Sequence, residues 1–231
     1  MNHLKTYQLL KIIFKINFFN FMKRPELATY LVKKNKKTLD NSDLEFYWSK
    51  KLSPSRAQEY LFTRGHARRM LSDIYKLDPL NIPLYSPPGK IPKLEKGYGF
   101  LSMSHCKDAS FIGWSKYPIG VDIEQKSRKF SADKIVKYYS DKEIKFLSKN
   151  FKNQFEEKVL DYWIIKEAAF KISGGILIRD LRNLIIDENN KNVYIKQLNL
   201  NKKFCLSYIS SWKIGIVYDS RIEKIKTLTC Y

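Results

Sequence analysis

Cysteine and histidine are scarce in this sequence, and both are scattered along it. The three cysteines, Cys106, Cys205 and Cys230, have neither the spacing of zinc ligands nor that of a small disulfide framework. Unpaired thiols are typical of a reducing compartment, so the sequence predicts a cytoplasmic location. A histidine-rich metal site is disfavoured because the histidines lie far apart, at His3, His66 and His105.

A long uninterrupted hydrophobic run is also missing. Residues 9–19 are largely apolar, but Lys11 and Lys15 interrupt them, and a membrane-spanning helix needs about 20 successive apolar residues. A signal peptide would require one clean apolar region and a small-residue cleavage site, and residues 1–23 have neither. We therefore expect no stable membrane insertion. The favoured interpretation of residues 1–23 is an amphipathic helix that packs on the protein body, and the alternative is one that touches a surface.

Acidic residues are few compared with basic ones. The chain has 43 Lys and Arg against 23 Asp and Glu, which gives a net charge of +20. A basic surface attracts nucleic acid, anionic lipid, phosphorylated ligands or acidic proteins. Codon bias explains the excess equally well, because Lys and Asn are abundant even where no motif occurs, as in residues 189–192. The charge alone therefore identifies no partner.

The chain has 231 residues, which is enough for one large domain or two small ones. Residues 33–43 are polar and predict a linker, and the short aromatic segment 44–48 predicts a strand. The Ser-Pro pair at residues 53–54 is typical of a helix start, and the helix is expected to run to about Tyr75. Prolines and glycines in residues 78–99 predict turns and loops.

The second half mixes helices and strands without a β-α-β rhythm. Residues 110–114 and 119–124 predict two strands that are joined near Tyr117 and Pro118. Segments after residue 184 alternate like an antiparallel sheet. Together these elements predict the α+β class. Helices are expected at about residues 131–139, 141–149 and 154–173.

Two acidic residues flank Ile123 in one of these strands. Because strand side chains alternate, Asp122 and Glu124 should face one side, and Val121 and Ile123 the other. Two close carboxylates repel each other unless a cation lies between them, and Mg²⁺ prefers oxygen ligands that it shares with substrate phosphates. Taken alone, this pattern is more often a solvated strand face.

The predicted helix 154–173 carries a third acidic residue. Trp163 and Glu167 share a face, and Lys171 lies one turn beyond Glu167. One interpretation is a core tryptophan beside a surface Glu167–Lys171 pair, which is common on any single helix. The functional interpretation adds a third carboxylate, with Lys166 and Lys171 placed for phosphate.

A serine and a histidine are adjacent at Ser104 and His105. The Gly-x-Ser-x-Gly sequence of a hydrolase nucleophile elbow does not surround Ser104. A hydroxyl beside an imidazole can instead hold phosphate oxygens through hydrogen bonds.

In this order, the pieces resemble a known family. Ser104 and His105 come first, followed by residues 120–124 (Gly-Val-Asp-Ile-Glu), 138–143 (Tyr-Tyr-Ser-Asp-Lys-Glu) and 163–171 (Trp-Ile-Ile-Lys-Glu-Ala-Ala-Phe-Lys). Over roughly residues 44–218 the chain is similar to the 4′-phosphopantetheinyl transferases of the larger, surfactin-synthetase-activating type.

The upstream region agrees with this resemblance. Gly89 and Lys90 look like the family's Gly-Lys-Pro loop, with one residue inserted before Pro92. Arg64 and Arg68, one turn apart, match its basic helix that grips coenzyme A. The alternative for these arginines is solvated surface charge.

The resemblance implies a pseudo-dimer of two similar α/β subdomains in a monomer, with the active site at their interface. An N-terminal extension over residues 1–40 lies outside the match. The N-terminal subdomain would span residues 41–118 and the C-terminal subdomain residues 119–231.

The resemblance also implies the reaction. The phosphopantetheine arm of coenzyme A would be transferred to a serine of an acidic acyl or peptidyl carrier protein, with release of 3′,5′-ADP. Mg²⁺ would be held by Asp122, Glu124 and Glu167, and the catalytic residues would be Glu167 and Lys171. Residues that bind coenzyme A would be Arg64, Arg68, Lys90, Ser104, His105 and Lys166.

The sequence departs from the family pattern in two places. Ser102-Met-Ser-His-Cys106 replaces Asn-(Ile/Leu)-Ser-His-Ser, and the turn after Lys171 is compressed to Gly174-Gly175-Ile176. A nucleic-acid-binding protein is the first rival, but no RNA-recognition signature or zinc finger is present, so no nucleic acid is expected. A peripheral membrane protein anchored by residues 1–23 is the second. An inactive homologue is disfavoured because the acidic residues are intact.

Overall fold

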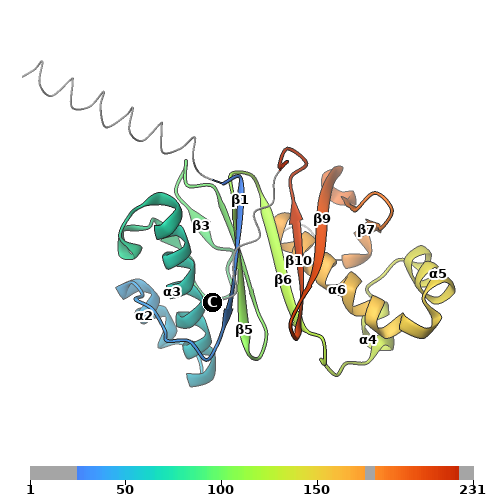
Figure 1. The fold of residues 1–231 in the computed structure, drawn as a ribbon, viewed down its shortest axis with the longest axis horizontal. Coiled ribbons are helices and arrows are strands. Elements are labelled where there is room, and N and C mark those ends of the chain that lie inside the picture. Colours follow the sequence, from blue (N-terminus) through green and yellow to red (C-terminus); the bar gives the residue numbers. More distant parts are fainter. Residues whose placement is uncertain (1–24, 175–179, 224–231) are drawn as a thin grey trace, which may run out of the picture.

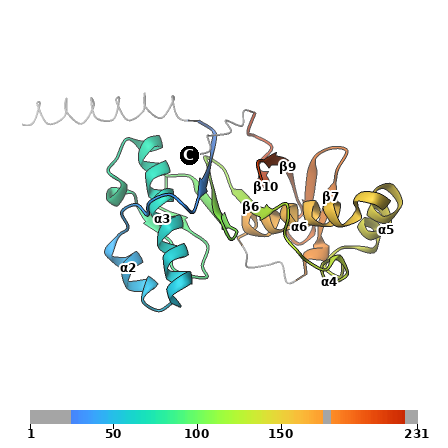
Figure 2. The ribbon, with the colours of Figure 1, turned by 60° about the horizontal axis from the view of Figure 1, so that its bottom comes forward.

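The computed structural model describes residues 25–174 and 180–223. Two antiparallel sheets lie in the middle of the molecule, with helices at both ends (Figures 1 and 2). In the described residues no helix is both long enough and apolar enough to cross a membrane. The expectations for residues 1–23, Gly175, Ile176 and Cys230 fall outside the described part of the chain.

The first sheet has the strand order β1-β5-β4. Its strands are β1 (Leu27–Lys33), β5 (Ala109–Ser115) and β4 (Phe100–His105). Helices α2 (Asp43–Ser49) and α3 (Pro54–Tyr75) cover its outer face, where Ala67 and Leu71 of α3 meet Ile112 of β5. A 3₁₀ turn η1 (Pro79–Asn81) and the short pair β2 (Leu84–Tyr85) and β3 (Lys93–Leu94) complete this half.

The second sheet has the order β6-β10-β9-β8-β7. Helix α6 packs along β6 and β10, and α4 and α5 lie beyond it (Figure 1). The strands are β6 (Ile119–Gln125), β7 (Leu184–Asp187), β8 (Asn192–Ile195), β9 (Leu200–Ile209) and β10 (Trp212–Tyr218). The helices are α4 (Ala132–Val136), α5 (Asp141–Asn150) and α6 (Phe155–Ile172), with 3₁₀ turns η2 (Lys152–Gln154), η3 (Leu181–Asn183) and η4 (Lys196–Leu198).

A hydrophobic core joins the two sheets. Leu31 of β1 and Phe111 of β5 are buried against Val121 and Ile123 of β6 and Ile214 of β10. Strand β6 therefore turns Val121 and Ile123 toward the first sheet. The sequence predicted the alternation of its side chains but not what each face contacts.

The even-numbered residues of β6 face helix α6. A Cβ atom added to Gly120 would lie 1.8 Å from the carbonyl oxygen of Ala168, so only glycine allows the helix to approach this closely. The close approach brings the next even position, Asp122, within reach of Lys171 on α6.

Most predicted elements are confirmed. Helix α3 has Ser53 at its N-cap and Pro54 at its first position, and it ends at Lys76 in the left-handed conformation with φ of 57°. The three predicted helices of the second half are present as α4, α5 and α6, and the later segments form the expected antiparallel strands.

The prediction of a strand at residues 44–48 is wrong, because these residues lie in helix α2. Ser42 accepts a hydrogen bond from the backbone of Glu45, and the Glu45 carboxylate accepts one from the backbone of Ser42, which is a capping box. The aromatic residues favoured a strand, but the cap and the tertiary contacts of Glu45 decided the local conformation. Residues 27–33, within the predicted N-terminal extension, form strand β1 and pair with β5.

Candidate functional site

The best-defined polar cluster surrounds Asp122, where the two sheets meet helix α6. Asp122 is only 5% exposed. Its Oδ1 accepts hydrogen bonds from Ser104 Oγ at 2.6 Å and from Lys171 Nζ at 2.7 Å. Lys171 also donates to the Val121 carbonyl at 3.0 Å. Strand β4, strand β6 and helix α6 therefore each contribute one side chain to the cluster.

The second carboxylate oxygen of Asp122 differs from the first. Oδ2 is buried, and no described residue donates a hydrogen bond to it. A buried carboxylate oxygen without a partner is costly unless a cation or a donor is supplied. The site therefore has an unsatisfied acceptor at its centre.

Glu124 and Glu167 extend the negative charge around Asp122. The pKa of Glu124 is raised to about 7, mainly by burial; the charges of Asp122 and Glu167 contribute to the increase, and those of Arg128 and Lys171 oppose it. Burial and the charge of Asp122 likewise raise the pKa of Glu167 above its ordinary value. The three carboxylates are thus close enough to destabilise one another's ionised forms.

These residues fit a divalent cation by chemistry and charge. They offer oxygen donors only, one of them without a partner, and their mutual repulsion would be relieved by a positive ion. In the described part of the chain, no three His, Cys, Asp or Glu side chains already converge in a metal-binding arrangement. Lys171 occupies one oxygen of Asp122, and Arg128 pairs with Glu124.

Basic groups gather on the neighbouring side of the cluster. His105 Nδ1 lies 3.1 Å from Glu59 Oε1, and Lys34 also pairs with Glu59. Burial lowers the pKa of His105, the carboxylate of Glu59 opposes this, and the charges of Lys34, Lys171 and Arg64 lower it further. The cations Lys34 after β1, Arg64 of α3 and Lys171 of α6 therefore all act on His105 of β4.

Arg64 reaches this region from helix α3. Its guanidinium stacks over the Tyr60 ring at 4.1 Å, and its Nε donates to Ser86 Oγ at 3.2 Å. Loss of hydration lowers the pKa of Arg64, and the half-buried guanidinium remains a cation at any ordinary pH. Lys90 lies on the exposed turn that contains Gly89, whose φ is 69°.

Arg68 does not join the site. It is 3% exposed and forms an ion pair with Glu45, with Nε 2.9 Å from Oε2. Its remaining donors reach Ser42 Oγ and the carbonyls of Pro79, Ile82 and Leu84. The predicted contact of Arg68 with coenzyme A disagrees with this geometry, because every donor of the guanidinium is already used inside the protein.

The ammonium group of Lys166 is also buried and hydrogen-bonded inside the protein. It is 0% exposed, and its Nζ donates to Glu143 Oε2 at 3.0 Å, to the Leu181 carbonyl at 3.0 Å and to the Leu184 carbonyl. An ammonium has three protons, and all three are used here. The predicted binding of phosphate by Lys166 therefore disagrees with the structure as well.

The sequence reasoning missed Arg128, Glu59 and Lys34. Arg128 lies four residues after Glu124 and pairs with it across the turn that follows β6. That spacing was a usable signal, because opposite charges four residues apart often meet. Glu59 and Lys34 are brought to His105 only by the packing of α3 and β1 on the first sheet, so no local pattern indicates them.

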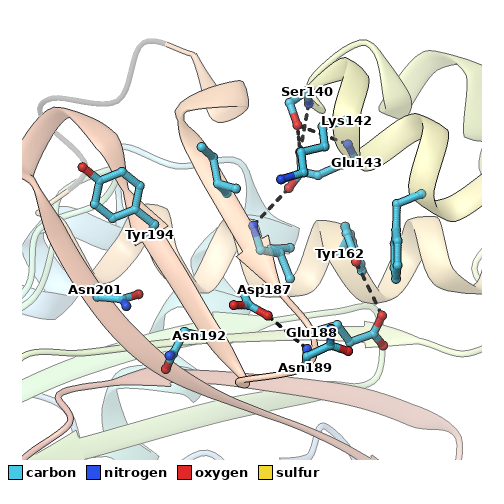
Figure 3. Close-up of a pocket in the computed structure, with 13 residues that line it drawn as sticks. Ser140, Lys142, Glu143, Tyr162, Asp187, Glu188, Asn189, Asn192, Tyr194 and Asn201 are labelled. Atoms are coloured by element: carbon cyan, nitrogen blue, oxygen red, sulfur yellow. Dashed lines mark hydrogen bonds between the residues drawn. The ribbon is translucent and has the colours of Figure 1, made fainter.

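A separate groove lies away from this cluster. A cavity of about 460 Å³ opens between α5 and the β7–β8 hairpin (Figure 3). Its only fully buried acidic residue, Glu143, is already satisfied by Ser140, Lys166 and the backbone of Ile186. Asp122, Glu124 and Glu167 do not line this groove.

Comparison with known families identifies the second half of the chain. Residues 118–217 match the family model of the 4′-phosphopantetheinyl transferase superfamily. The match runs from the start of β6 nearly to the end of β10 and includes the three carboxylates and Lys171. A comparison with curated proteins found no match. Residues 118–217 are thus similar to this superfamily, and the match supports a transferase enzyme of this kind.

Proposed function

We propose that the protein transfers the 4′-phosphopantetheine arm of coenzyme A to a serine of an acidic acyl or peptidyl carrier protein. The observation that carries this proposal is the buried, unpartnered oxygen of Asp122, beside two carboxylates of raised pKa and a group of cations. A phosphoryl transfer needs both features: an oxygen-rich place for a cation and positive side chains for phosphate.

Asp122, Glu124 and Glu167 would hold Mg²⁺ in this proposal. When bound, Mg²⁺ would neutralise charge on the phosphoryl oxygens and on the leaving group. Lys171 would move its hydrogen bond from Asp122 to a phosphate oxygen, because both partners are anionic oxygens within reach of one flexible side chain.

The protein's own residues supply the remaining steps. Arg64, Lys90 and His105 would bind the phosphates and the nucleotide, and Ser104 would orient Asp122 through the hydrogen bond between them. Glu167 would accept the proton of the carrier serine, for which a raised pKa suits it. The serine oxygen then bonds to the β-phosphorus, the bond to the bridging oxygen breaks, and 3′,5′-ADP leaves.

We also propose that the two halves form a pseudo-dimer within a cytoplasmic monomer. A similar order of elements supports this: a short capped helix, a long helix and a 3₁₀ turn occur as α2-α3-η1 and as α5-α6-η3, although the second series has the additional 3₁₀ turn η2 between its helices. In both halves the long helix covers the outer face of a sheet.

The test is intact mass spectrometry of apo carrier proteins after incubation with the enzyme, coenzyme A and Mg²⁺. A panel of fatty-acid, polyketide and peptide-synthetase carriers should include at least one that gains the mass of the arm. Glu167→Gln should abolish this gain. Glu156→Gln is the control and should not, because Glu156 is exposed near the start of the same helix, whereas Glu167 lies near its end. The proposal fails if no carrier gains mass, or if Glu167→Gln transfers at a near-normal rate.

A further inference from the structure

Helix α2 has an inverted distribution of polar and apolar side chains. Its buried residues are Glu45 and Ser49. Its large apolar side chains point outward, with Leu44 57%, Phe46 47% and Tyr47 56% exposed. A surface helix of a globular protein ordinarily turns its apolar side inward.

The reason for the inversion is the ion pair behind the helix. Glu45 is held by Arg68 and by the backbone of Ser42 in the capping box. Rolling the helix to bury Tyr47 would pull the Glu45 carboxylate away from Arg68 and leave a buried charge without a partner. The outward orientation of the apolar side chains is therefore fixed by the fold.

The exposed side chains form one continuous patch. At about 100° per residue, Tyr47 lies opposite the buried side, with Leu44 and Phe46 to either side of it. Half-buried Trp48 continues the surface and packs edge-on against Tyr85, with ring centroids 5.3 Å apart, and Tyr85 is itself exposed. We call Leu44, Phe46, Tyr47, Trp48 and Tyr85 the α2 patch. Contiguous apolar surface of this kind marks an interaction site.

The charges around the α2 patch favour an anionic partner. Lys50 and Lys51 are exposed immediately after the helix, and Lys51 Nζ lies 4.6 Å from the centroid of the Tyr47 ring. Asp43 is an acidic exception at the other end of the helix. The whole chain has a net charge of +20. A second copy of the chain is disfavoured, since a two-fold contact would bring like-charged surfaces together.

The α2 patch lies away from the carboxylate cluster. Helix α3 and the first sheet stand between α2 and the β6–α6 region in both views (Figures 1 and 2). A carrier protein docked on α2 could not present its serine across these layers. The α2 patch therefore has a role that is separate from the transfer reaction.

We propose that the α2 patch binds the surface of an anionic membrane. Leucine and aromatic side chains insert at the boundary between headgroups and acyl chains, and adjacent lysines contact the lipid phosphates. The exposed Leu44, Phe46 and Tyr47 and the paired Lys50 and Lys51 supply both parts of this recognition within one short segment. Such binding is reversible and lies in the plane of the interface.

Vesicle flotation with the full chain tests this proposal. The wild type should bind vesicles that contain phosphatidylglycerol and should bind vesicles of phosphatidylcholine alone much more weakly. The double variant L44S/Y47S should lower binding to the anionic vesicles by at least roughly tenfold. K50E/K51E should lower it by roughly fivefold or more for each lysine, and added salt should weaken the wild type.

A matched control replaces exposed apolar residues of the other half. Ile185 and Leu200 are 36% and 41% exposed on β7 and β9, so I185S/L200S removes similar apolar surface. This variant should bind vesicles like the wild type, and circular dichroism should show all variants folded. The proposal is overturned if the wild type does not bind anionic vesicles. It is also overturned if L44S/Y47S binds like the wild type, which would assign binding to residues 1–23, or if the α2 patch proves to join two copies in light scattering.

Discussion

The two halves of the molecule use the same device to hold a long helix, but with different residues. In the N-terminal half, the capping-box residue Glu45 pairs with buried Arg68 of α3, which also donates to carbonyls of the following turn and strand. In the C-terminal half, the capping-box residue Glu143 pairs with buried Lys166 of α6, which donates to the carbonyls of Leu181 and Leu184. Each cation ties a short helix, a long helix and the segment after it together.

The two halves differ in the contacts of a second basic residue on each long helix, Arg64 on α3 and Lys171 on α6. Arg64 of α3 stacks on Tyr60 and reaches the electrostatic surroundings of His105. Lys171 of α6 contacts Asp122 directly. Arg68 and Lys166 are thus held by capping-box glutamates, whereas Arg64 and Lys171 have other partners, Tyr60 and Ser86 for Arg64 and Asp122 for Lys171.

Replacing Lys171 should have the largest effect on activity. Lys171→Met removes the cation beside Asp122, and we expect transfer to fall by roughly a hundredfold to a thousandfold, as for loss of one donor to a developing anion. The free energy of unfolding should fall by less than for the fully buried ion pairs, because the Lys171 side chain is 25% exposed, although Asp122 loses its cation. Steady-state transfer rates and chemical denaturation measure the two quantities. A large loss of stability with normal transfer would reverse the assignment.

Replacing the buried cations Arg68 and Lys166 should instead affect mainly the stability of the protein. Arg68→Met and Lys166→Met each leave a buried glutamate without its partner, and we expect about 3–5 kcal/mol of destabilisation. Adding Glu143→Gln to Lys166→Met should restore part of the loss. The neighbouring Arg69→Met is the control, since Arg69 is exposed and should change stability by about 0.5 kcal/mol or less. Urea unfolding measures these values.

Arg64 and Arg56 of α3 should differ in their contribution to coenzyme A binding. Arg64→Met should weaken coenzyme A binding by roughly tenfold, the magnitude of one charge-assisted hydrogen bond, and should leave the fold intact. Arg56→Met changes an exposed arginine on the same helix and should bind normally. Isothermal titration with coenzyme A gives both affinities, and equal values for the two variants would contradict the proposed place of Arg64.

The smallest expected effect is a loss of stability of the N-terminal half at acidic pH. Burial lowers the pKa of His66 on α3 below the ordinary value of 6.5. The unfolded chain therefore binds the proton first, so the free energy of unfolding decreases as the pH falls below about 6.5. All three histidines precede residue 106, so no histidine contributes in the C-terminal half, where the raised pKa values of Glu124 and Glu167 act in the opposite direction.

His66→Gln should flatten this decrease. Hydrogen exchange at pH 5.5 should show the amides of α3 better protected, relative to those of α6, in the variant than in the wild type. An identical pattern in the two proteins would exclude His66 as the source.

Local sequence patterns predicted the helices and strands that carry the carboxylates. The alternation of β6 placed Asp122 and Glu124 on one face, and the spacing on α6 placed Glu167 and Lys171 one turn apart. Such patterns depend on neighbours in the chain, so they can be read without the fold. The superfamily match over residues 118–217 agrees with this part of the sequence reasoning.

The roles of the basic residues could not be predicted in the same way. Arg64 and Arg68 look equivalent in the sequence, and so do Lys166 and Lys171. The partner of Arg68 could not be predicted either, because residues 44–48 were predicted as a strand and Glu45 lies in a helix.

By itself, the sequence determined the α+β class, helix α3, the three helices of the second half and the acidic residues of the candidate site, because periodicity, caps and spacing are local properties. Only the tertiary structure decided which cations are buried with a glutamate and which face Asp122, and it alone turned the apolar side of α2 outward. The physical reason is that a charge is stabilised or neutralised by groups far away in the chain, which packing brings within a few ångströms.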